Sequence, residues 1–163
     1  MKARLGYVSN SSSSSFMVEN PGVDDISREA NEREAEAYIV SHALDEIELH
    51  GKWNGLLEEG ETKFGWQEEE YHDIASKWNW LVLQAFYGGQ NEMTLIDNYL
   101  NRLDSRIHVN WNDVEERDDK AYAYIDHQSV SPIDTFHFIE MVGGIGEWCG
   151  DWYCFISNGN DNH

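Results

Sequence analysis

Two long segments in the first half of the chain space their apolar residues as amphipathic helices do. The first follows Pro21-Gly22 and ends at Gly51, and its apolar residues recur three and four positions apart: Ala30, Ala37, Val40, Leu44 and Ile47. The second opens with three glutamates at 68–70, which suit the positive end of a helix, and closes on two glycines at 88–89. Its wide stripe predicts a buried face made of Tyr71, Ile74, Ala75, Trp78, Leu81, Val82, Ala85 and Phe86.

A third, shorter helix is predicted over Glu92–Leu103, with Asn91 as its N-cap. Two tryptophans, Trp53 and Trp80, fall outside the apolar stripes and are candidates for surface contacts. The first two-thirds of the chain are therefore expected to be mainly helical.

After Asp104 the apolar period changes from helical to alternating, which indicates strands. Residues 106–111 are predicted to form one strand, and residues 121–127 a second. The acidic stretch 112–119 between them is expected to be a turn or loop, so that the two strands could form a hairpin.

The C-terminal part is less uniform. Ser131 and Pro132 suit a helix start, but residues 135–142 fit a helix only loosely and could instead form a strand. The glycine-rich stretch 143–146 is interpreted as a turn. A last strand is predicted over Trp152–Ile156, followed by a loose polar tail over residues 157–163.

The N-terminal segment, residues 1–18, is serine-rich, and its run consists of Ser11, Ser12, Ser13, Ser14 and Ser15. One interpretation is a flexible polar loop or tail. A second is a short hairpin between Tyr7-Val8 and Phe16-Met17-Val18, whose serine amides and hydroxyls could hold an anion. Phosphorylation of the serines is a third interpretation.

Composition predicts one folded domain over residues 1–163. The chain has 31 acidic and 11 basic residues, so its net charge is −20, yet 40% of its residues are hydrophobic. Such a charge excludes a basic surface for direct nucleic-acid binding and disfavours an anionic membrane. The N-terminus lacks a signal peptide and no apolar stretch is long enough to span a membrane, so we expect a soluble protein.

The negative charge is concentrated before the midpoint, where residues 19–73 carry 17 acidic and 4 basic side chains. Glu29, Glu32 and Glu36 are predicted to form a ridge on the outer face of the first helix, about 5–6 Å apart, which is close to the spacing of phosphates. We expect a partner with a basic surface to contact this ridge and the nearby carboxylates of Glu58, Glu59 and Glu61.

The opening Arg4-Leu5-Gly6-Tyr7-Val8-Ser9-Asn10, followed by the five serines and Phe16, resembles the start shared by many small, uncharacterised proteins of tailed bacteriophages and prophages. The resemblance covers this segment, and the group carries no activity that transfers to the chain. It implies a phage setting, with the protein in the host cytoplasm or in the virion.

Motifs of the common nucleotide-binding, zinc-protease and serine-hydrolase sites are absent from the sequence. Four side chains on neighbouring predicted elements could nevertheless converge into a metal or acid–base site: His108, Asp126, His127 and His137. Lone histidines on strands are more often structural. Cys149 and Cys154 do not have zinc-site spacing and are expected to be buried thiols. We expect no bound metal and no cofactor.

The predicted fold is α+β, with a short N-terminal hairpin, about three helices and a C-terminal antiparallel sheet. The sequence leaves three function classes. The first is an acidic binding module that imitates nucleic acid and occupies a DNA- or RNA-binding protein of the host. The second is a virion-associated structural or interaction protein. The third is a small metal- or histidine-dependent hydrolase. We regard a binding protein as the better expectation than an enzyme.

Overall fold

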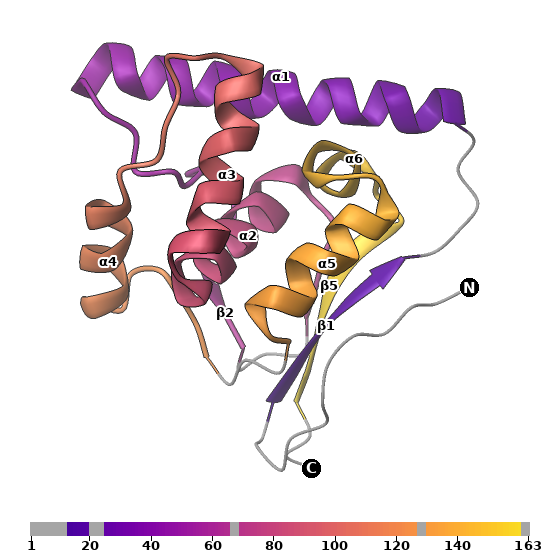
Figure 1. Cartoon of the computed structure of the whole chain (residues 1–163). Helices are drawn as coiled ribbons and strands as arrows, with labels where there is room; N and C mark the ends of the chain where they lie inside the picture. Colours follow the sequence, from indigo (N-terminus) through magenta and orange to yellow (C-terminus); the bar gives the residue numbers. More distant parts are fainter. Residues whose placement is uncertain (1–12, 20–24, 66–68, 127–129, 161–163) are drawn as a thin grey trace.

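The computed structural model describes residues 13–19, 25–65, 69–126 and 130–160 (Figure 1). Its helices are α1 (Asp25–His50), α2 (Ile74–Gly88), α3 (Gln90–Leu103), α4 (Trp111–Asp119), α5 (Pro132–Val142) and α6 (Ile145–Gly150). Its strands are β1 (Ser13–Glu19), β2 (Lys63–Phe64), β3 (Glu69–Tyr71), β4 (Tyr124–Ile125) and β5 (Cys154–Asn160). The fold is α+β and mostly helical.

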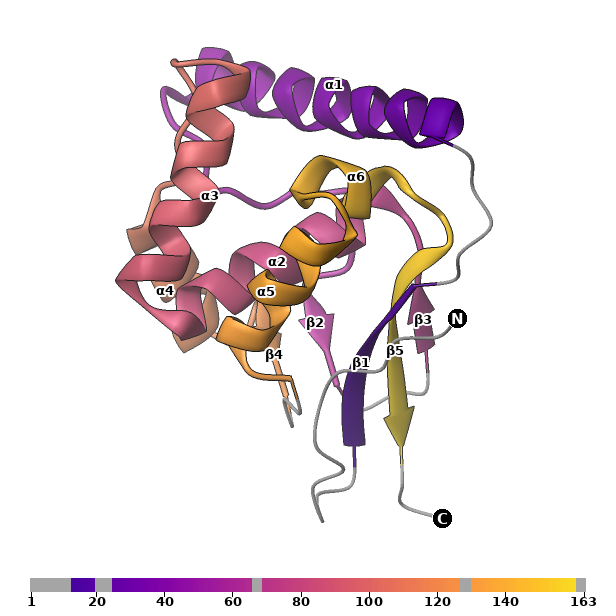
Figure 2. The same cartoon turned by 45° about the vertical axis from the view of Figure 1, so that its right-hand side comes forward.

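Helix α2 lies in the middle of the molecule, and α1 runs across one end of it (Figure 1). A three-stranded antiparallel sheet in the order β1-β5-β3 lies to one side, as Figure 2 shows, and β2 and β4 form a separate parallel pair. None of the helices in the described part of the chain combines the length and the apolar composition needed to cross a lipid bilayer.

The N-terminal strand pairs with the C-terminal one. Phe16 of β1 lies opposite Ser157 of β5, and the register continues from Ser13 to Glu19. The expected hairpin partner, Tyr7-Val8, lies outside the described residues. The expectation that residues 157–163 are a loose tail is wrong for 157–160, which belong to β5 and gain the backbone hydrogen bonds of the sheet.

Helix α2 is buried on every side, which overturns one prediction from the apolar stripes. Trp80 is fully buried and packs at 6.2 Å from the Trp148 ring, while Trp53 stacks on Trp78 at 6.1 Å. An outer polar face is not needed in a helix that packs against α3, α4, α5, α6 and β4. Position outside a stripe therefore does not place a tryptophan at the surface here.

The segment predicted as a hairpin contains a helix in its middle and only one short strand. Ile107 and Val109 are buried as the alternation predicts, but they lie in an irregular segment that ends where α4 begins at Trp111. Residues 112–119, expected as a loop, form α4, which Val114 anchors as the single fully buried side chain of this helix. The second predicted strand shortens to β4, which pairs in parallel with β2. Alternating apolar residues over such a short segment therefore predicted which side chains are buried, but not whether the segment pairs with another strand.

Helix starts follow capping chemistry more than charge. Helix α2 does not begin at the glutamates 68–70; Glu69–Tyr71 is β3, and the Asp73 carboxylate caps the helix by accepting from Ser76 N at 2.8 Å. Helix α3 begins after Gly89 instead of at Asn91. The Ser131 side chain caps α5, so the helical interpretation of residues 135–142 is correct.

Helix α1 has the predicted extent, and its predicted core face is correct in part, because Val40, Leu44 and Ile47 pack partly buried against the core. Ala35, Ile39 and Ala43 are fully buried, whereas Ala30 and Ala37, which were expected to face the core, are exposed. Small residues are favoured on the buried face because α6 packs closely against α1 (Figure 2). A methyl group on Gly150 would lie 2.1 Å from the carbonyl oxygen of Asn31.

Replacing Gly150 by alanine is therefore expected to push α6 away from α1. The added methyl group meets backbone, which cannot rotate aside, and overpacking of this kind costs about 1–3 kcal/mol. Urea unfolding of Gly150→Ala should show this loss of the free energy of unfolding. Unchanged stability would mean that α6 does not pack on α1 as described.

A buried lysine joins α2 to the turn between α6 and β5. The Lys77 ammonium donates to the carbonyl oxygens of Trp148, Asp151 and Cys154 at 2.8, 2.8 and 2.9 Å. Burial lowers the pKa of Lys77 to about 8, although the nearby thiols and carboxylates counteract this shift. The ammonium form supplies one N–H to each of the three carbonyl groups.

Candidate functional site

Most basic side chains of the described chain are already engaged. Lys77 is buried, and the following bases each pair with a carboxylate: Arg28, Arg33, Lys52, Arg106 and Lys120. Because acidic residues outnumber basic ones by almost three to one, this pairing leaves a large excess of carboxylates at the surface. An approaching molecule therefore meets a strongly negative surface.

Three of the carboxylates predicted to contact a partner lie on one anchored loop. We call residues 54–61 the acidic loop; it carries Glu58, Glu59 and Glu61, all exposed. The buried side chain of Asn79 on α2 accepts from Leu57 N at 2.7 Å, and its amide donates to the carbonyl oxygens of Leu57 and Glu61 at 2.8 and 3.0 Å.

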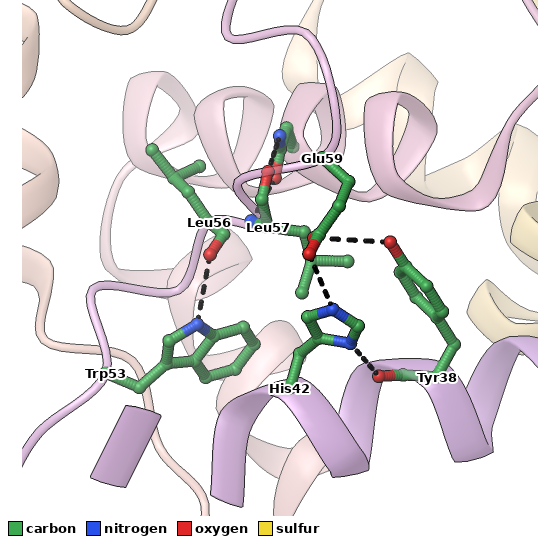
Figure 3. Close-up of polar contacts among 7 residues, drawn as sticks. Tyr38, His42, Trp53, Leu56, Leu57 and Glu59 are labelled. Carbon is green, nitrogen blue, oxygen red and sulfur yellow. Dashed lines mark hydrogen bonds and ion pairs between the residues drawn. The ribbon is translucent and has the colours of Figure 1, made fainter. Parts of the chain in front are cut away.

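Further hydrogen bonds fix both ends of the acidic loop. The Trp53 indole donates to Leu56 O at 3.0 Å (Figure 3), and the Trp78 indole donates to Gly55 O at 2.7 Å. At the other end Glu61 N donates to Ser76 Oγ at 3.0 Å. The loop backbone is thus held by buried groups at residues 55–57 and at Glu61, so ordering of this backbone adds little to the cost of binding a partner.

Glu59 also contacts helix α1. Its carboxylate accepts from Tyr38 Oη at 3.3 Å and lies 2.9 Å from His42 Nε2, while His42 Nδ1 lies 3.0 Å from the carbonyl oxygen of Tyr38 (Figure 3). Both ring nitrogens face acceptors, so only the imidazolium can donate to both. Burial alone would lower the pKa of His42, but the hydrogen bonds to Tyr38 and Glu59 and the charges of Glu59 and Asp45 raise it overall.

The contact predicts a specific titration. NMR should give His42 a pKa above 6.5, and Glu59→Gln should lower it because the charged acceptor is lost. The contact stabilises the fold below the unfolded-state pKa of histidine, and this contribution disappears as pH rises through the raised pKa. Its size is below about 1 kcal/mol because both side chains meet solvent. An unchanged pKa in Glu59→Gln would contradict the contact.

The other three predicted carboxylates do not form an outward ridge. Glu29 is exposed, but Glu32 and Glu36 are half-buried and line a cavity beside α6. A methyl group on Gly146 would lie 3.0 Å from each of these two side chains. Burial and the charges of Glu36 and Glu29 raise the pKa of Glu32. Glu59 therefore contacts one side of α1, whereas Glu32 and Glu36 lie on the other side, and the buried face of the helix lies between them.

No protein-family model, curated protein or solved structure matches the chain. Its function is therefore inferred from the residues themselves.

The proposed histidine cluster gains no support within the described residues. His108 lies in the irregular segment before α4, where it lines a cavity with Lys52 and Arg106, and His137 is exposed on α5. Asp126 follows β4, and His127 lies outside the described residues. Across the described chain, no three His, Cys, Asp or Glu side chains are grouped so that they could hold a metal ion.

The structure describes part of the serine run and both cysteines. Ser13, Ser14 and Ser15 belong to β1 and not to a loop, whereas Ser11 and Ser12 lie outside the described residues. Cys149 and Cys154 are buried thiols, as expected, and burial raises the pKa of Cys149 to about 12. The Cys149 thiol is therefore a poor nucleophile near neutral pH.

Sequence reasoning missed the residues that hold the acidic loop. Ser76 and Asn79 are polar residues inside the apolar second helix, and Tyr38 and His42 lie one turn apart on the first. Polar residues within an otherwise apolar helix were a usable signal, because a buried amide needs hydrogen-bond partners. Their partner, the loop 54–61, could not be identified without the fold.

Proposed function

We propose that the chain is a phage accessory protein that binds a basic surface of another protein and so imitates the charge of nucleic acid. The observation that carries the proposal is the acidic loop, whose exposed carboxylates Glu58 and Glu61 are attached to a backbone fixed by Asn79 and Ser76. Carboxylates on such a backbone resemble phosphates on a stiff duplex, since in both cases the backbone that carries the charges is ordered before binding.

Charge supports the same proposal. With a net charge of −20, the chain repels nucleic acid and attracts the surfaces that bind nucleic acid. The opening segment that resembles phage proteins supplies a setting in which such a host protein is a useful target.

Affinity capture tests the proposal. Tagged protein is incubated with bacterial lysate at low salt, the resin is eluted with rising salt, and the eluted proteins are identified. We expect a nucleic-acid-binding protein that elutes as salt screens the contact. Proteins with acidic or neutral surfaces, retained at high salt, would contradict the proposal.

A second candidate is the virion-associated interaction protein. It is favoured by two neighbouring exposed aromatics in the turn before β5, Trp152 at 63% and Tyr153 at 51% exposure. Trp152 stacks on His72 with ring centroids 4.8 Å apart, which holds the indole in place. Capture of capsid or tail proteins when the experiment is repeated with lysate of phage-infected bacteria, insensitive to salt, would favour this candidate.

A further inference from the structure

A cavity of about 380 Å³ opens where α1, α3, α5 and α6 meet, and we call it the four-helix groove. Phe136, Ile139 and Tyr99 are almost completely buried along it. The apolar residues of its lining are Leu95, Tyr99, Leu103, Phe136, Ile139 and Ile145. An apolar lining of this kind suits apolar side chains of a ligand.

Carboxylates border the apolar lining from two helices. Glu32 and Glu36 contribute from α1, and Glu140 contributes from α5. Tyr99 Oη donates to Glu36 at 3.4 Å, which directs one carboxylate towards the groove residues. Burial, together with the charges of Glu36 and Glu29, raises the pKa of Glu32, so a cation placed here would relieve repulsion between the carboxylates.

The groove already accommodates one guanidinium group. Arg102, which also lines it, lies over the ring of Tyr99 with 5.8 Å between its Cζ and the ring centroid. Arg102 covers the aromatic face, so the neighbouring carboxylates are the groups left to recognise a further arginine or lysine.

Exposed apolar side chains continue the groove outwards. Leu95 is 49% exposed on its border, and on α5 the exposed Ile133 lies one turn before Phe136. Large apolar side chains beside a groove, with carboxylates around them, are typical of surfaces that receive an amphipathic helix.

We infer that the four-helix groove binds a basic amphipathic helix of a partner protein, with its apolar face on Leu95, Leu103 and Ile145 and its cations on Glu32, Glu36 and Glu140. Charge complementarity selects this occupant: a second copy of the chain would bring another strongly negative molecule to carboxylates that already repel one another. The inference rests on the proposed function only in taking the partner to be basic.

Fluorescence anisotropy with a synthetic peptide tests the inference. The probe contains only leucine and lysine over roughly 18 residues, about five turns, with leucines at helical spacing. A scrambled peptide of the same composition and a poly-lysine of equal charge are measured beside it. The groove variant is Leu95→Ser with Glu140→Lys, and its matched control is Leu49→Ser with Glu48→Lys, which alters exposed residues of the same kinds at the end of α1.

We expect the amphipathic peptide to bind at least about tenfold more tightly than the scrambled one. The groove variant should lose about tenfold in affinity for the amphipathic peptide, and the control variant should lose little. NMR shifts caused by the peptide should concentrate on α3 and α5. Equal binding of both peptides, equal losses in both variants, or shifts elsewhere would overturn the groove as the site.

The results with the different peptides distinguish failure of the groove as a binding site from failure of the proposed function. Binding of poly-lysine without selective binding of the amphipathic peptide would overturn the groove and leave a basic-surface binder intact. Failure to bind either probe at low salt would count against both proposals. Peptide-dependent dimerisation of the chain, seen by light scattering, would also overturn the inference.

Discussion

Replacing Lys77 by methionine is expected to lower the free energy of unfolding by about 3 kcal/mol. The carbonyl groups of Trp148, Asp151 and Cys154 would each lose their donor in a buried site, and an unsatisfied buried polar group costs about 1–3 kcal/mol. Methionine recovers part of this loss because it has no charge to desolvate. Urea unfolding monitored by tryptophan fluorescence measures the difference.

The loss should be local to the turn between α6 and β5. The buried thiols of Cys149 and Cys154 lie at this turn, so a thiol reagent should modify them faster in Lys77→Met than in the wild type. Lys120→Met is the control, because Lys120 is exposed and pairs with Glu116 on α4; it should change stability by less than about 0.5 kcal/mol. Equal stabilities of the two variants would show that Lys77 does not hold the turn.

Reversing two charges of the acidic loop is expected to have the largest effect on binding. Glu58→Lys combined with Glu61→Lys should weaken binding of a basic partner by about 2–3 kcal/mol, or roughly 30- to 140-fold at low salt, because each attraction becomes a repulsion. Glu59 is left unchanged, since its contact with His42 joins the loop to α1. Isothermal titration calorimetry at two salt concentrations gives the affinities.

A matched reversal on α4 distinguishes local contact from overall charge. Glu115→Lys combined with Asp119→Lys alters two exposed carboxylates and gives the same net charge as the loop variant. We expect this control to weaken binding much less. Equal weakening would mean that the partner responds to total charge and that the acidic loop has no special part.

The sequence predicts helices well where apolar residues recur over several turns. The extents of α1, α3 and most of α2 follow from such patterns, and Ser131 with Pro132 marks the start of α5. The sheet could not be predicted, because β5 pairs with β1 from the opposite end of the chain and with β3 from the middle. Pairings this distant in sequence depend on packing and leave no local signal.

The sequence predicted which carboxylates belong to the candidate site, but not how they are placed in space. Charge density identified Glu58, Glu59 and Glu61, but the rigidity of their loop depends on Asn79, a buried amide on another element. Glu32 and Glu36 were predicted to face outwards, whereas small residues on both helices let α6 approach and enclose them. The fully buried residues of α1 are Ala35, Ile39 and Ala43. The apolar pattern did not identify them, because it was drawn through the larger apolar residues nearby.

The most direct test of the central claim is a competition experiment with the nucleic-acid-binding protein obtained by capture. Its complex with the chain is titrated with duplex DNA, and the fraction of bound chain is followed by anisotropy of a fluorescent label. If the chain imitates nucleic acid, DNA should displace it completely, and its apparent Kd should rise in proportion to the DNA concentration. A ternary complex of partner, DNA and chain, with an unchanged Kd, would contradict the claim.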